Sequence, residues 1–248
     1  NGNDWLNYHP TGGAAGTYRG IPNMIYPESK FHPGDTTSTS TVRNEGPLKI
    51  TVHSITNDNK WEALWEFYPT YARMTLLKKD HNYWFLYEGT PGGSVEADSD
   101  FVMRSDGTQS SLATAWSGDL SGAEWTYFAD PSVNRALFVV NHANDSQVDS
   151  YRLMTEAAGS MTVFGFGRQN TSPLLTATPA TFTFGLIDTV ALNAATKTIS
   201  DAYRPLTIQG GVIELVDGTT PPTATTNPAG TELLVFDLNR QVTTKDRG

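Results

Sequence analysis

Apolar and polar positions alternate along much of this chain, most clearly between Lys60 and Glu88. Positions 61, 63, 65 and 67 carry Trp, Ala, Trp and Phe, whereas positions 62, 64, 66 and 68 carry Glu, Leu, Glu and Tyr. A period of two is typical of a strand with one buried face and one polar, aromatic face. The stretch therefore predicts three consecutive strands joined by short turns.

Similar runs recur along the chain and are separated by turn-forming sequences such as Asp106-Gly107 and Asp130-Pro131. Their short length and regular spacing predict an all-β fold, a two-sheet antiparallel β-sandwich of the jelly-roll type with little helix. The strands are expected near residues 47–55, 60–68, 72–79, 82–88, 99–105, 111–116, 124–129, 134–141, 148–154, 161–167, 181–188 and 211–217.

The chain is expected to form a single domain with three parts. Residues 1–45 are rich in Gly, Pro, Asn and Thr and predict an irregular N-terminal wrap that carries aromatic, His and Arg side chains. Residues 46–217 form the jelly roll, in which 189–203 is the best candidate for one or two helical turns. Residues 218–248 begin as a Thr/Pro-rich segment and predict a last strand at 232–238.

Composition limits the functions that this fold can have. Hydrophobic residues make up 38% and charged residues 17% of the chain, which predicts a folded core. The chain has no cysteine, and this excludes disulfides, cysteine nucleophiles and thiolate metal sites. The net charge is −9 and no Lys/Arg run exceeds two residues, so nucleic acid is not an expected partner. No apolar run reaches the ~18 residues of a membrane span. Because the chain starts at Asn1, we expect it to be processed. A monomer is the preferred oligomeric state.

Glu62 and Glu66 are the first candidates for chemistry. Glycoside hydrolysis needs two carboxyl groups, about 5–5.5 Å apart for retention or ~6.5–9.5 Å apart for inversion. Positions i and i+4 of a strand have α-carbons ~13 Å apart, a gap that two long side chains leaning together can close. Jelly-roll glycosidases of the laminarinase type carry Glu-x-Asp-x-Glu on a strand, but here the middle position is Leu64.

A basic and aromatic set in the same stretch favours a different reaction. A uronate lyase needs a cation to neutralise the sugar carboxylate and a base to remove the C5 proton. We expect Arg73 and Arg19 to neutralise the carboxylate and Tyr87 or His142 to accept the proton. The expected stacking platforms are Trp61, Trp65 and Trp84, and the other expected substrate contacts are Lys78, His81, Tyr83, Glu62 and Glu66.

Two further segments carry candidate residues. In residues 141–152, Asp145 and Asp149 are placed to bind Ca²⁺, which prefers oxygen ligands. The strand MTVFGFGRQ holds glycines at 165 and 167, and glycine within a strand marks a bulge or a close approach of backbone or ligand. Arg168, at the end of this strand, is an expected anion contact.

The runs WEFYPTYARMTLLKKDHNYWFLYEGTPGG and EWTYFADPSVNRALFVVNH resemble the concanavalin A-like, laminin-G-like jelly-roll superfamily of bacterial carbohydrate-active proteins. The likeness covers roughly residues 45–190 and lies in strand spacing and aromatic content. It implies a secreted, cell-surface or periplasmic bacterial protein with a glycan ligand, often with a structural calcium ion and no other cofactor.

These observations leave three functions open. The preferred one is a secreted lyase that cleaves a uronate-containing polysaccharide or oligosaccharide by β-elimination. The alternatives are a glycoside hydrolase that uses Glu62 and Glu66, and a non-catalytic carbohydrate-binding or adhesion module. Trp61 and Trp65 lie on the strand face opposite Glu62 and Glu66, so the two pairs are not expected to line one groove.

Overall fold

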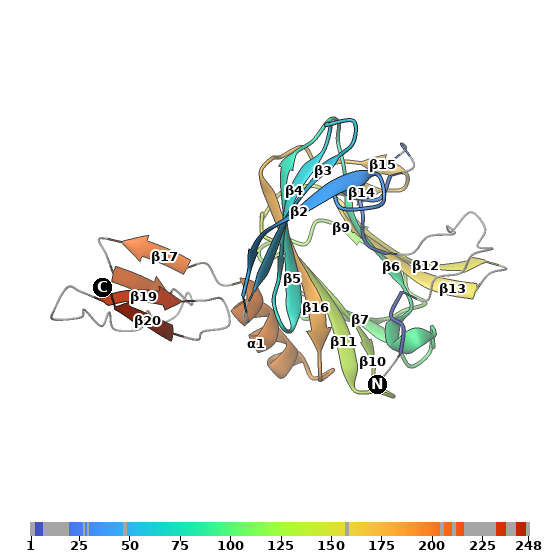
Figure 1. Cartoon of the computed structure of the whole chain (residues 1–248). Coiled ribbons are helices and arrows are strands. Elements are labelled where there is room, and N and C mark those ends of the chain that lie inside the picture. Colours follow the sequence, from blue (N-terminus) through green and yellow to red (C-terminus); the bar gives the residue numbers. More distant parts are fainter. Residues whose placement is uncertain are drawn as a thin grey trace.

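The computed structural model of the chain describes residues 3–6, 20–26, 28, 30–46, 49–156 and 159–203, together with the backbone of four short strands after residue 205. The described part is an all-β sandwich of two antiparallel sheets with one covering helix, α1 (Leu192–Tyr203) (Figure 1). The predicted fold class is thereby confirmed. No helix of the described residues is long and apolar enough to cross a membrane.

The larger sheet has nine strands, and neighbouring strands pair antiparallel. In spatial order they are β2 (Ser38–Glu45), β3 (Ile50–Thr56), β4 (Glu62–Phe67), β5 (Tyr71–Lys78), β16 (Ala180–Ile187), β11 (Arg135–Asn141), β10 (Trp125–Asp130), β7 (Phe101–Arg104) and β8 (Gln109–Ser111).

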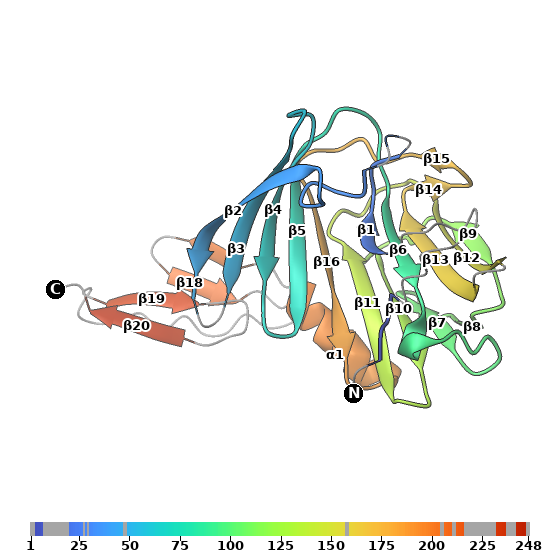
Figure 2. The same cartoon turned by 45° about the vertical axis from the view of Figure 1, so that its right-hand side comes forward.

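The smaller sheet has five strands and faces the larger one (Figure 2). Its order is β1 (Gly20–Asn23), β6 (Phe85–Gly89), β13 (Gly159–Phe166), β12 (Asp149–Glu156) and β9 (Trp116–Gly118). A two-residue hairpin, β14 (Arg168–Gln169) with β15 (Ser172–Pro173), follows β13, and the short 3₁₀ turn η1 (Pro91–Gly93) follows β6.

Aromatic side chains fill the space between the sheets. Phe85 of β6 stacks on Phe182 of β16 with ring centroids 4.4 Å apart, and Tyr87 packs on Phe128 at 5.0 Å. These contacts join the two sheets, because each pair takes one ring from either side. Burial of such large rings is the main force that holds the layers together.

A second core lies on the other face of the larger sheet, beneath α1. Phe138 and Val140 of β11 point to this face and pack with Ala195 and Ile199 of the helix. Figure 1 shows α1 along the side of the larger sheet that faces away from the smaller one. The helix is therefore longer than the one or two turns expected from the sequence, because its apolar face has a sheet to cover.

The ends of the chain differ from the sequence prediction. Residues 20–23 and 38–45 form strands β1 and β2, so these parts of the expected N-terminal wrap belong to the sandwich. The strand expected at 211–217 is β18 (Val212–Leu215), which pairs with β17 (Leu206–Gln209) rather than with a sandwich sheet. β19 (Glu232–Phe236) forms a further hairpin with β20 (Val242–Asp246). Residues 218–230 lie outside the described residues.

Candidate functional site

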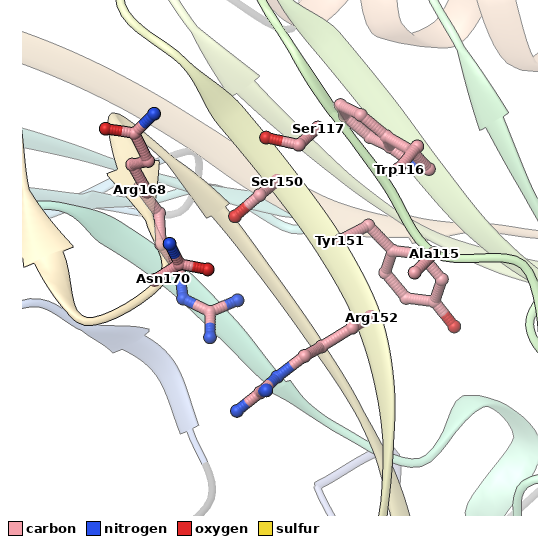
Figure 3. A pocket seen from close by; sticks show the side chains of 9 residues that line it. Ala115, Trp116, Ser117, Ser150, Tyr151, Arg152, Arg168 and Asn170 are labelled. Carbon is pink, nitrogen blue, oxygen red and sulfur yellow. The ribbon is translucent and has the colours of Figure 1, made fainter.

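A cavity of 450 Å³ opens on the outer face of the smaller sheet, and we call it the arginine groove (Figure 3). Its walls come from β9, β12 and the β14 hairpin, three segments that are distant in sequence. It is lined by Ala115, Trp116, Ser117, Ser150, Tyr151, Arg152, Arg168, Gln169 and Asn170.

The alternation of β12 explains which side chains reach the groove. Asp149 and Tyr151 are 1% exposed and turn toward the core, where the Tyr151 hydroxyl donates to the carbonyl of Leu112 over 2.6 Å. Ser150 and Arg152 therefore point outward into the groove. Tyr151 contributes to the wall but its hydroxyl is engaged elsewhere.

Arg168 reaches the groove because the chain turns sharply after β13. Gly167 has φ +60°, a left-handed conformation that favours glycine, and its N–H donates to the Asp149 carboxylate over 3.0 Å. The turn brings the Arg168 side chain back over Gly165: a Cβ at position 165 would lie 3.0 Å from Arg168 Cβ. A glycine at 165 is therefore what leaves room for Arg168.

The groove carries positive charge that its own walls do not neutralise. Arg168 is 6% exposed, so its side chain is largely withdrawn from water. Burial lowers the pKa of Arg168, and so does the nearby charge of Arg152, whereas Glu88 acts in the opposite direction. Figure 3 shows the ends of Arg152 and Arg168 side by side. No Asp or Glu is among the described residues that line the groove.

Polar groups without partners accompany the two arginines. The Ser150 hydroxyl is buried and has no hydrogen-bond partner among the described residues, and the same holds for Trp116 Nε1. Trp116 is half-buried and stacks beneath the Arg104 guanidinium at 5.0 Å. A smaller cavity of 60 Å³ shares Trp116 and Ser117 with the groove, which extends the hollow surface past the indole ring.

A second polar cluster lies on the outer face of the larger sheet. Thr183 Oγ1 accepts a hydrogen bond from Arg73 Nε at 3.3 Å and lies 2.8 Å from His142 Nε2. Arg73 also donates from Nη2 to the carbonyl of Ala202 at the end of α1. Burial lowers the pKa of His142 to about 3, and Arg73 adds to this effect. The imidazole is therefore neutral at physiological pH.

Glu62 and Glu66 point outward on the same sheet face, each toward a different basic side chain. Glu62 Oε1 lies 2.5 Å from His53 Nε2, and Glu66 Oε1 lies 2.6 Å from Lys49 Nζ. Trp61 and Trp65 point into the core, as the alternation predicted. The two pairs thus occupy opposite faces of β4.

The predicted aromatic contacts need correction, because all five rings are buried in the core. Tyr87 has no exposed surface, and its hydroxyl donates to the carbonyl of Trp5 over 3.0 Å, so it is not placed to meet a substrate. The sequence of a strand does not reveal which of its faces a second sheet covers. In the structure, the covered face is the one that carries these large rings. The buried set is Trp61, Trp65, Tyr83, Trp84 and Tyr87.

The remaining predicted residues are dispersed. Lys78 donates to the carbonyl of Asn59, and His81 Nε2 lies 3.1 Å from Glu28 Oε1, both away from the arginine groove. Arg19 lies outside the described residues.

Each of the two predicted calcium ligands accepts hydrogen bonds from backbone groups of the protein. The Asp149 carboxylate accepts N–H groups from Leu120 and Gly167, and burial raises its pKa to about 8. Asp145 instead accepts from the N–H of Gln147. Neither belongs to a group of metal-binding side chains among the described residues.

Of the predicted residues that the structure describes, only Arg168 lines the groove, and sequence reasoning missed Arg152, Ser150 and Trp116. The glycines at 165 and 167 were the signal that pointed to Arg168. Comparison of the chain with protein families, with curated proteins and with solved structures found no match.

Proposed function

We propose that this protein binds an acidic polysaccharide of the uronate class, and that the arginine groove holds a sugar carboxylate. The observation that carries the proposal is the pairing of Arg152 with the buried Arg168 in one cavity whose lining includes no acidic side chain. A guanidinium binds a carboxylate through two parallel hydrogen bonds, and such charge-assisted bonds are among the strongest in proteins.

The surroundings of the arginines support a sugar better than a simple anion. The Ser150 hydroxyl has no partner among the described residues, and Ser117 and Asn170 add further donors and acceptors for sugar hydroxyls. A volume of 450 Å³ is within the range of ligand sites.

Binding is tested by titration calorimetry of the protein with polygalacturonate or alginate, with dextran as the neutral control and dextran sulfate as the sulfated one. Polyuronates are expected to bind, and Arg168→Gln is expected to weaken binding roughly 10-fold or more. Arg135→Gln is the matched control, because it removes the same charge from an ion pair with Asp188 outside the groove.

The uronate assignment is overturned by three outcomes: no binding to any polyuronate, tighter binding of dextran sulfate, or equal effects of the Arg168 and Arg135 substitutions. Arg168→Lys adds a finer measure. It keeps the charge but loses the planar pair of donors, so an intermediate loss of affinity is expected.

Cleavage by β-elimination is a second candidate function, and the observation that favours it is the contact of Arg73 and His142 through Thr183. In this reaction a base takes the C5 proton of the uronate. The C4–O bond breaks, its electrons leave with the oxygen, which gains a proton, and the C–H electrons form the C4=C5 double bond. His142 would accept the proton in this step, and its lowered pKa makes it a weak base for that role. A guanidinium stabilises the carboxylate as charge develops.

One assay distinguishes cleavage from binding alone. Polyuronates incubated with the protein are followed by the ultraviolet absorbance of the unsaturated product and by new reducing ends. Absorbance that His142→Ala abolishes supports the lyase. Reducing ends without absorbance favour a hydrolase that uses Glu62 and Glu66, and retention of the glycan without either signal favours a binding module.

A further inference from the structure

Three carboxylates meet at one end of the sandwich, outside the arginine groove and the Arg73–His142 cluster. Glu96, Asp100 and Asp130 each place an oxygen within 4.8 Å of the other two. Glu96 and Asp100 belong to the connection between η1 and β7, and Asp130 is the last residue of β10. Asp100 is 1% exposed and Asp130 is 4% exposed, so most of this negative charge is shielded from water.

The protein does not neutralise this cluster with its own groups. Among the described residues no Lys, Arg or His forms an ion pair with any of the three carboxylates. Asp100 Oδ2 accepts the N–H of Glu96 over 2.8 Å, but its other oxygen, Oδ1, is buried and has no hydrogen-bond partner. Oδ1 is thus the oxygen left for the space between the carboxylates. A buried oxygen without a partner is costly unless something binds it.

The electrostatics of Asp100 also indicate that the cluster lacks a compensating positive charge. Burial raises the pKa of Asp100 to about 7, and the charges of Asp130 and Glu96 raise it further against the Glu96 hydrogen bond. A divalent cation would relieve all three carboxylates at once.

A second acidic group shows the contrast. Glu28, Asp80 and His81 also lie within 4.8 Å of one another. Here the protein supplies its own cation, because Lys60 Nζ lies 3.1 Å from Asp80 and 4.0 Å from Glu28. This group is therefore balanced without a metal ion.

We propose that Glu96, Asp100 and Asp130 form a Ca²⁺ site. Calcium is a hard cation that takes six to eight oxygen ligands, and carboxylates are its preferred anionic ligands. The bound ion would tie the connection that leaves β6 in the smaller sheet to the end of β10 in the larger one. Gly92 of η1 packs against this point, since a Cβ there would lie on Asp130 Oδ2.

The proposal is tested by calorimetric titration and thermal unfolding of the chelator-treated protein with CaCl₂. At Ca²⁺ a hundredfold above Kd, the melting temperature is expected to rise by roughly 5 °C or more. Asp100→Asn should abolish this rise. The Glu96 N–H then holds the amide oxygen, and the NH₂ group points at the ion. The matched control, Asp80→Asn, removes the same charge from the lysine-balanced group and should keep the full response.

If Asp100→Asn does not fold, Glu96→Gln provides the same test, because Glu96 is exposed and its change leaves the core intact. The site would be overturned by a melting temperature that does not change with Ca²⁺. It would also be overturned if Ca²⁺ raised the melting temperature of Asp100→Asn as much as that of the wild-type protein. A response to Mg²⁺ as large as that to Ca²⁺ would overturn the assignment to calcium, because Mg²⁺ demands a tighter octahedral shell.

Discussion

Gly165 lies directly beneath Arg168. A Cβ at position 165 would lie 3.0 Å from Arg168 Cβ, 3.1 Å from its Cδ and 2.2 Å from Cδ2 of Leu86. The Arg168 side chain thus packs directly against the backbone of β13. The position of its guanidinium in the arginine groove depends on the absence of a side chain at Gly165.

Gly165→Ala is expected to displace Arg168 and to weaken polyuronate binding. The added methyl group must push Leu86 and Arg168 aside, and overpacking of this kind costs about 1–3 kcal/mol of stability. Binding is measured by calorimetry and stability by urea unfolding. Gly118→Ala in β9 is the control, because nothing lies within 4 Å of its added Cβ. Unchanged affinity in the Gly165 variant would show that Arg168 does not depend on this contact.

Thr183→Val is expected to destabilise the protein by about 1–3 kcal/mol, because it leaves Arg73 Nε and His142 Nε2 without their shared oxygen. Thr183 is fully buried, so water does not replace the hydroxyl. Thr75→Val is the comparison, since Thr75 is half-buried and, among the described residues, its hydroxyl bonds only to that of Thr181. Urea midpoints measure both variants. A larger loss in the Thr75 variant would contradict this account.

Stability is expected to rise as the pH falls from 8 to about 6.5. Burial raises the pKa of Asp100 and Glu124 to about 7 and that of Asp149 to about 8, above unfolded values of 3.8 to 4.5. In this window the folded state keeps protons that the unfolded state has released, so each rise in pH favours unfolding.

Below about pH 6.5 the trend is opposed by histidine. The pKa of His142 is lowered to about 3 in the folded state, so only the unfolded imidazole gains a proton there. Urea midpoints measured without divalent cations at pH 6.5 and 8 test the carboxyl effect. A midpoint that climbs between pH 6.5 and pH 8 would contradict it.

Saturating Ca²⁺ is expected to reduce this pH dependence. A bound ion keeps Asp100 ionised in the folded state, so its share of the proton uptake disappears, whereas the shares of Glu124 and Asp149 remain. The measured slope of stability against pH should therefore become shallower in the wild-type protein and stay unchanged in Asp100→Asn. An identical change of slope in both proteins would speak against Asp100 as the ligand.

The order of the strands along the chain could be read from local patterns. The period of two, broken by turn sequences, placed strands such as β4, β5 and β11 to within a few residues. β2 was missed because its sequence, STSTVRNE, has no apolar face and its positions are almost all exposed. Such an edge strand is held by pairing with β3, a feature that hydrophobic alternation does not record.

The groove could be predicted only in part. Glycines around position 166 indicated a close approach and pointed to Arg168, whereas Arg152 and Trp116 look like ordinary strand residues. Their meeting depends on the pairing of β12 with β9 and β13, which is set by contacts distant in sequence. The tryptophans of β4 were misread as ligand platforms because no local signal says which face the second sheet covers.

The polar edge formed by β2 affects the behaviour of the molecule among its own copies. β-Rich proteins risk joining edge to edge, since unpaired N–H and C=O groups invite another strand. Here that rim is strongly hydrophilic, and its pairing register with β3 shifts between Val42 and Asn44. A hydrophilic edge strand with an irregular register is a poor template for pairing with a strand of another copy, and it disfavours edge-to-edge aggregation at high protein concentration.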